Sequence, residues 1–275
     1  MSRRRGPPVL GRWLMRAAVA LVLLFLLAPA LIVVPLSFAG DAMTRFPPKQ
    51  FSFLAYQNYL HGPGWVDSTV FSLTMAGTVM VLAVVIGTLT AYGIVKASRR
   101  VRRTLSILVL LPMMVPTIIF AIAVYWLLAD LKILGTLAGF IVANLVLAVP
   151  YAVITIRNGI EGLDPSLAKA ASTLGARPAR VFVKVTAPLL FPALAAGALF
   201  AFLVAFDEVV VAQFISGSFA VPLPKRMWDG ILFRWDPAIS AISTIQIAIT
   251  VAVLVVLGLL HRRGQHAQPR TETPS

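Results

Sequence analysis

Six long apolar stretches, separated by shorter polar segments, dominate the pattern of the chain. They are Ala17–Phe38, Ser68–Val95, Thr104–Ala129, Ile133–Ile156, Val185–Phe206 and Pro237–Leu260. A helix that crosses a bilayer needs about 20 predominantly apolar residues, and each stretch meets that length without an interior charge. The pattern therefore predicts an all-α, polytopic membrane protein with six transmembrane helices.

The same pattern divides the chain into consecutive parts. Residues 1–16 form a basic N-terminal segment, 17–38 the first transmembrane helix, 39–67 an outer segment, 68–261 a core of five helices and 262–275 a tail expected to be disordered. The alternative for the first stretch is a cleaved signal peptide, since Ala28-Pro29-Ala30 offers a site of small residues. The stretch continues beyond the roughly 7–15 apolar residues typical of a signal peptide, so an uncleaved helix is predicted.

Prolines and glycines inside the stretches predict kinks and close helix contacts. Pro112 and Pro116 lie in the third stretch and Pro150 in the fourth. Each proline removes a backbone hydrogen bond and favours a kink. Gly135 and Gly139 are four residues apart in the fourth stretch. This spacing predicts a helix face that a neighbouring helix can approach closely.

The distribution of charge predicts the topology. Only 12% of residues are charged and the net charge is +14. With six spans, 18 of the 24 basic residues fall on the side that holds both termini. The positive-inside rule places that side in the cytoplasm, so the outer segment 39–67 becomes periplasmic and the protein belongs in a bacterial inner membrane. The excess of cations is expected to hold anionic lipid headgroups rather than nucleic acid.

Candidate catalytic and metal-binding chemistry is absent from the sequence. The chain has no cysteine, and its three histidines are scattered without ligand spacing. Neither a phosphate-binding glycine loop of the G-x-x-x-x-G-K-[ST] type nor a paired acid or Ser-His arrangement is visible. The sequence therefore predicts a protein that is not an enzyme, with no metal site and no cofactor of its own.

A punctuated polar segment, Leu163–Pro188, separates the fourth and fifth stretches. Asp164 suits a helix N-cap, Pro165 the first helical position and Gly175 the left-handed residue after the end. An apolar face with the spacing i, i+3, i+4 and i+7 is formed by Leu167, Ala170, Ala171 and Leu174. A second short helix is expected over Pro178–Val185, with Pro188 opening the fifth span.

A helix of about ten residues is too short to be stable alone, so the first helix of this segment must pack on something. One interpretation is packing on its own bundle or on lipid headgroups. The other is docking into a groove of a cytoplasmic partner.

This segment resembles the Glu-Ala-Ala loop of type I ABC importer permeases. Lys169-Ala170-Ala171 is followed after three residues by Gly175 and after nine more by Val185-Thr186-Ala187-Pro188. The resemblance implies that 68–261 is the type I transmembrane core, with a coupling loop at 158–186. It also implies three partners besides membrane lipids: a cytoplasmic ABC ATPase dimer that hydrolyses ATP-Mg, a second permease subunit and a periplasmic substrate-binding protein.

The resemblance assigns coupling to a set of residues in this loop. They are Leu167, Lys169, Ala170, Ala171, Leu174, Gly175 and Pro188. Two positions depart from the family pattern: Lys169 replaces the glutamate, and Ala187 replaces the leucine before the proline. The first departure puts the family's ion pair with the ATPase in doubt, and the fit is expected to rest on the small and apolar residues.

Two further stretches, FAFLVAFDEVVVAQFISG and LPKRMWDGI, resemble the shorter permease of spermidine/putrescine importers. A polyamine needs carboxylates and aromatic faces to replace its hydration. Candidate residues for the substrate pathway are Asp207, Glu208, Trp228 and Asp229. Alternatively, Asp207 lies at the membrane interface, solvated or paired with Arg234 or Lys225.

Other functions remain open beside polyamine import. The same family includes carriers of other small solutes, such as aminophosphonate, iron or other organic ions. A different class, an ATP-independent secondary transporter, predicts an inverted repeat and coupling acids near the bilayer midplane, and neither is visible. A membrane-embedded enzyme would need a catalytic constellation that the sequence lacks.

Overall fold

The computed structural model describes residues 9–40, 46–48, 50–217, 220–233, 236 and 238–266. Arg3, Arg4, Arg5 and Arg234, which entered the topology and pairing predictions, lie outside these residues, as does 267–275 of the predicted tail. The chain forms two compact units, one of residues 1–63 with 233–249 and one of residues 64–232 with 250–275.

The first unit contains α1 (Val9–Leu36) and the short helix α2 (Leu54–His61). Aromatic side chains connect the residues that follow α1 with α2. The ring of Phe38 lies 5.7 Å from that of Phe53 and 5.2 Å from that of Tyr56, measured between centroids. The hydroxyls of Ser37 and Tyr56 are 2.8 Å apart. The outer segment therefore contains a helix packed on an aromatic cluster.

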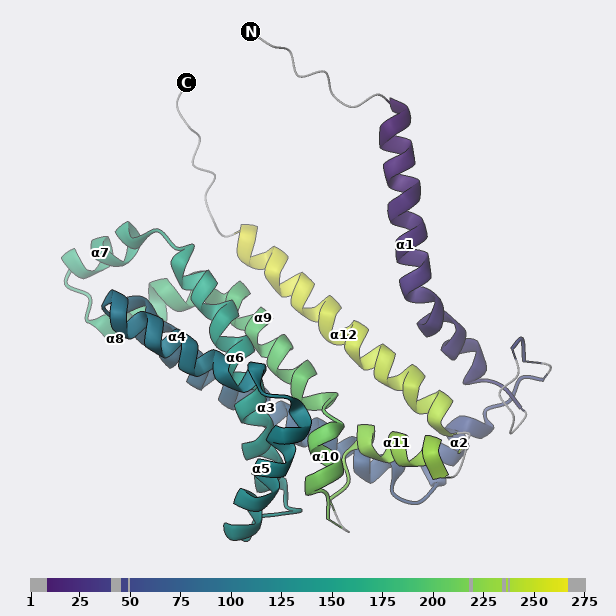
Figure 1. Cartoon of the computed structure of the whole chain (residues 1–275). Coiled ribbons are helices and arrows are strands. Elements are labelled where there is room, and N and C mark those ends of the chain that lie inside the picture. The colour runs from purple at the N-terminus through teal and green to yellow at the C-terminus, as the bar shows by residue number, and fades with distance from the viewer. Residues whose placement is uncertain are drawn as a thin grey trace. The chain divides into compact units, whose positions relative to one another are not determined.

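The second unit contains most of the helices of the chain. They are α3 (Trp65–Lys96), α4 (Arg99–Met114), α5 (Thr117–Asp130), α6 (Leu137–Glu161), α7 (Pro165–Thr173), α8 (Pro178–Val181), the π-helix η1 (Phe182–Thr186), α9 (Ala187–Phe206), α10 (Val210–Ile215) and α11 (Leu223–Phe233). The last helix, α12 (Ala238–His266), begins in the first unit and ends in the second. Figure 1 shows α3, α6 and α9 side by side, with α7 at one end of this group and α5 and α10 at the other.

The predicted membrane class and all-α fold are confirmed. Five helices of the described chain are long and apolar enough to cross a membrane. A sixth span is present if α4 and α5 are taken together as one span, although a bend of 97° separates them. The break falls at Val115 and Pro116, where proline cannot donate the helix hydrogen bond and disfavours a helical residue before it. The kink predicted at Pro116 is therefore confirmed as a break in the helix, whereas Pro112 and Pro150 lie inside the continuous helices α4 and α6.

Small residues bring α3, α6 and α9 close together. A Cβ atom at Gly87 of α3 would lie 2.9 Å from the Cβ of Ala152 in α6. A Cβ atom at Gly159 of α6 would collide with the Cβ of Ala193 in α9. Close approach through glycine and alanine is how helices gain packing energy where lipid is as apolar as the side chains.

The interpretation of Gly135 and Gly139 as a helix-packing face is wrong. Gly135 has a left-handed φ of 72° and lies in the turn before α6. A Cβ atom there would stand 3.1 Å from the Cα of Gly217. The Thr136 side chain caps α6 by accepting a hydrogen bond from the Gly139 N–H. The wrong prediction arose because the apolar stretch in the sequence runs through this turn without a polar break. The close approach of Gly217, which is far away in the sequence, could not be read from the local pattern.

Candidate functional site

The short helix α7 begins and ends with the predicted caps. An Asp164 carboxylate oxygen accepts a hydrogen bond of 2.9 Å from the Ser166 N–H. Hydrogen bonds from Ser166, chiefly from its backbone N–H and secondly from its side chain, stabilise the charged carboxylate and so lower the pKa of Asp164. At the other end Gly175 adopts a φ of 81°. The Gly175 and Ala176 N–H groups donate to the carbonyls of Ser172 and Ala171, which forms a Schellman motif.

The predicted apolar face of α7 is covered by the bundle only in part. No residue of this helix is buried. Leu167 is 47% exposed and Leu174, just after the helix, is 89% exposed. Ala168 and Ala171 are half-buried, so the side nearer the bundle shares Ala171 with the predicted face but also includes Ala168, which that face leaves out. The outward side carries Leu174 together with exposed residues of the helix: Ser166, Lys169, Ala170 and Thr173.

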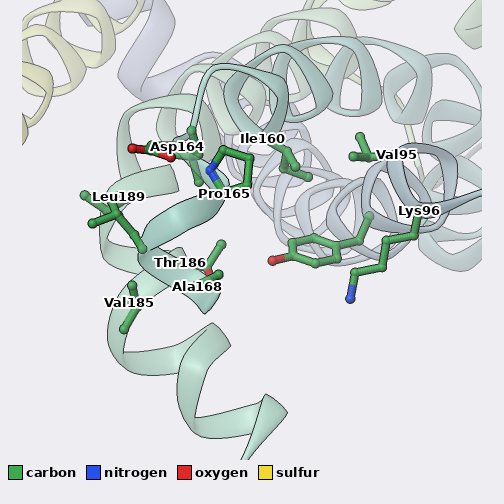
Figure 2. Close-up of a pocket in the computed structure, with 12 residues that line it drawn as sticks. Val95, Lys96, Ile160, Asp164, Pro165, Ala168, Val185, Thr186 and Leu189 are labelled. Carbon is green, nitrogen blue, oxygen red and sulfur yellow. The ribbon is translucent and has the colours of Figure 1, made fainter. Parts of the chain in front are cut away.

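A cavity of about 180 Å³ lies between α7 and the helices behind it. Its lining combines the ends of α3 and α6, the start of α7, and the segment that joins η1 to α9. Figure 2 shows Asp164, Pro165 and Ala168 beside this cavity, with Lys96 on α3. The space between α7 and the helices behind it is therefore incompletely filled.

The predicted second short helix over Pro178–Val185 is wrong as a separate element. α8 continues through η1 into α9, so that 178–206 forms one helical stretch. Pro188 does not open this stretch but lies in the first turn of α9. Because proline lacks an N–H and its ring clashes with the carbonyl four residues earlier, the helix widens there, and the Ala187 N–H donates to the Phe182 carbonyl.

Aromatic side chains form a contact between η1, which follows the loop, and α3. The ring of Tyr92 meets that of Phe182 edge to face, with centroids 5.5 Å apart. The Lys96 ammonium lies 5.1 Å from the Tyr92 ring centroid. Thr186 is buried in the same region. A displacement of α7 would therefore reach α9 through α8 and η1, which α7 contacts and which are continuous with α9, and would reach α3 through the ring contact of Phe182 with Tyr92.

A charged network joins α4 to the end of α6. The Glu161 carboxylate is paired with Arg102 of α4 and, at 2.9 Å, with Arg157 of α6. Arg157 also donates to the Ser106 hydroxyl at 3.2 Å. These side chains are partly exposed, so the network fixes geometry more than it adds stability.

The predicted pathway residues lie on separate elements. Asp207 is exposed at the end of α9. Glu208 accepts a hydrogen bond of 3.0 Å from the Val211 N–H and so caps α10. On α11, Asp229 pairs with Lys225 at 2.6 Å, and Trp228 is half exposed. Lys225, one of the two predicted partners of Asp207, thus forms its ion pair with Asp229.

Sequence reasoning missed a polar contact between α11 and α3. The Arg226 guanidinium lies 5.5 Å from the Trp65 ring centroid and donates to the Ser68 hydroxyl at 3.2 Å. The Leu223 N–H donates to the buried Ser72 hydroxyl at 2.8 Å. Trp65, Ser68 and Ser72 follow helical spacing at the start of α3, which is the only local signal that could have suggested this contact.

Residues 83–266 match the family model described as the binding-protein-dependent transport system inner membrane component. The chain is 30% identical over 257 residues to the spermidine/putrescine transport system permease protein PotC of Haemophilus influenzae, covering 92% of this chain and 98% of that protein. It is 28% identical to the putrescine transport system permease protein PotI of Escherichia coli, covering 80% of this chain and 81% of that protein.

A solved structure with the same fold is a bacterial ABC transporter involved in the import of the acidic polysaccharide alginate. The match has a TM-score of 0.74 at 20% identity and covers 92% of this chain and 98% of that one. Together with the helical membrane fold, these matches define a multi-pass permease of an ABC importer, a transport subunit of the inner membrane. The chain belongs to the family of binding-protein-dependent transport system inner membrane components.

Proposed function

We propose that this permease imports polyamines of the spermidine/putrescine type, driven by a separate ATPase that docks on α7. It pairs with a second permease subunit and receives substrate from a periplasmic binding protein. Both termini lie in the cytoplasm, the chain has no nucleotide site or cofactor of its own, and ATP-Mg is hydrolysed by the ATPase. The observation that carries the coupling role is the outward-facing, unburied apolar edge of α7 at Leu174.

The coupling role follows from what α7 exposes and what lies behind it. Burial of a leucine side chain is worth about 1.5–3 kcal/mol, and Leu174 gains almost none of this within its own chain. The cavity beneath α7 permits movement, and the continuous helix from Pro178 to Phe206 transmits it. Rigid-body motion passed through packed elements is a common way to drive a conformational switch.

The substrate assignment rests on the polyamine permeases that match most of the chain. Fold alone does not select a substrate, since a transporter of acidic polysaccharide has the same fold. Among the candidate residues, Asp207 is exposed at the end of α9 and Trp228 is half exposed on α11. We assign the contact with a polycation to this carboxylate and this aromatic face.

The test is reconstitution of the complete transporter in liposomes with its ATPase and binding protein. ATP-dependent uptake of labelled spermidine or putrescine is expected, and uptake of an aminophosphonate or of iron is not. Uptake of another solute in place of polyamine would reject the substrate assignment alone. Transport by this chain without ATP would instead support a secondary transporter and reject the whole proposal.

Asp207→Asn is expected to lower the rate of polyamine uptake about tenfold. Loss of the charge removes about 1.4 kcal/mol of attraction for a cation in the pathway. Uptake is measured in liposomes. The control is Asp130→Asn, which neutralises an aspartate at the end of α5 to which no role in transport is assigned. Unchanged uptake by Asp207→Asn would remove this acid from the pathway.

Gly175→Val is expected to weaken the association with the ATPase about tenfold. A left-handed φ costs a residue with a Cβ about 1–2 kcal/mol, and no heavy atom within 4 Å would obstruct the side chain, so the effect comes from the backbone. Copurification with the ATPase measures it. Gly175→Asn is the matched control, because asparagine tolerates this conformation. Equal loss in both variants would show that bulk rather than backbone geometry matters.

A further inference from the structure

The segment from α7 to η1 presents a strongly basic surface. Four cations are exposed on it: Lys169, Arg177, Arg180 and Lys184. Asp164 is the one acid between Gly162 and Thr186 in the sequence. We call these four cations, together with Leu174, the basic coupling surface.

The cations of this surface have no acidic partner in the part of the chain that the structure describes. Elsewhere in the described residues, Arg102, Arg157 and Lys225 each form an ion pair with Glu161 or Asp229. None of the four cations of the basic coupling surface has such a pair among the residues that the structure describes. The Asp164 carboxylate does not serve them, because it caps α7 and lines the cavity on the bundle side.

Lys169 has the most favourable position of the four for contact with another protein. It is exposed on α7 and does not line the cavity, unlike its neighbour Ala168 and unlike Pro165 one turn earlier. Ala170, also exposed, lies between Lys169 and Leu174 on this outward side. The outward side of α7 is therefore flat at Ala170, with the charge of Lys169 on one side of it and the apolar side chain of Leu174 on the other. Its complement is a cleft with an apolar wall and a carboxylate on the opposite wall.

We propose that the docking cleft of the ATPase is acidic and that one of its carboxylates pairs with Lys169. This inference rests on the proposed docking of α7 on the ATPase, and it specifies in addition that the docking cleft carries negative charge. A lipid headgroup is the competing occupant. The position of α7 beyond the ends of α6 and α9 favours a protein for Lys169, whereas Arg180 and Lys184 lie at the start of the membrane-spanning stretch (Figure 1).

The test measures the affinity of the full-length permease for its own ATPase in nanodiscs of neutral phosphatidylcholine, at several salt concentrations. Lys169→Glu is expected to raise Kd at least tenfold at low salt, and Lys169→Gln by a smaller factor. The salt dependence of Kd should become weaker in Lys169→Gln, because the screened pair no longer exists. It should become weaker still in Lys169→Glu, because salt there screens a repulsion between two carboxylates. Lys132→Glu makes the same change of charge in the turn before α6 and should leave Kd unchanged.

A compensating change identifies the partner's carboxylate. Acids in the ATPase cleft are replaced one at a time by lysine, and one replacement is expected to restore binding to Lys169→Glu. Unchanged or tighter binding by Lys169→Glu would overturn the acidic cleft. An effect that appears only after anionic phosphatidylglycerol is added would also overturn it, in favour of headgroups.

The proposed docking of α7 is tested separately by Leu174→Asp. Loss of binding in this variant, with Lys169→Glu unaffected, would reject the ion pair and leave the coupling role intact. Wild-type binding in both variants would reject α7 as the docking element, and with it both proposals.

Discussion

Leu174→Asp is expected to reduce ATP-driven uptake and association with the ATPase at least 100-fold while the permease remains folded. The side chain is 89% exposed, so its replacement removes no packing within the chain and should change the free energy of unfolding by less than about 0.5 kcal/mol. In the complex, a carboxylate would lie unpaired against an apolar wall, which costs several kcal/mol. Copurification with the ATPase, uptake in liposomes and thermal unfolding in detergent measure the three effects.

Leu131→Asp provides the matched control for this prediction. Leu131 is 56% exposed and directly follows α5. Figure 1 shows α5 and α7 at opposite ends of the helices of the second unit. The same substitution there should leave association with the ATPase intact. If both variants lost association with the ATPase equally, the effect would come from a general disturbance of the permease and not from the contact at Leu174. Full association in Leu174→Asp would mean that α7 does not dock through this leucine.

Gly159→Leu is expected to lower the melting temperature of the permease by about 5 to 10 °C. The added Cβ would collide with the Cβ of Ala193, so α6 and α9 would have to separate along their contact. Overpacking of this kind costs about 1–3 kcal/mol, and each kcal/mol shifts the melting temperature of a chain of this size by about 2–4 °C. Size-exclusion chromatography after heating in detergent measures the shift.

Gly77→Leu is the control for this clash. Gly77 lies inside α3, and no heavy atom stands within 4 Å of the Cβ that a side chain would add. The substitution should be neutral or slightly stabilising, since leucine favours a helix over glycine. An unchanged melting temperature in Gly159→Leu would mean that α6 and α9 do not approach as closely as described.

The sequence alone determined the membrane class, the helical fold and the caps of α7. Hydrophobic length is a local property, so the apolar stretches predicted the spans without knowledge of their contacts. Asp164 and Gly175 act on backbone groups within a few residues, and both adopt the predicted geometry. The match of the loop to a family of permeases was visible for the same reason, because its motif is continuous in sequence.

Only the tertiary structure decided which faces are covered and where helices end. The spacing of Leu167, Ala170, Ala171 and Leu174 defined an apolar face but not its surroundings, and the structure leaves Leu174 exposed. The contact between Gly135 and Gly217 carries no local signal. The helical spacing of Ser68 and Ser72 suggests a polar face on α3 but does not identify Arg226 as its partner. The bend between α4 and α5 and the π-helix before α9 required the structure as well, because proline permits an interruption whereas packing sets its form.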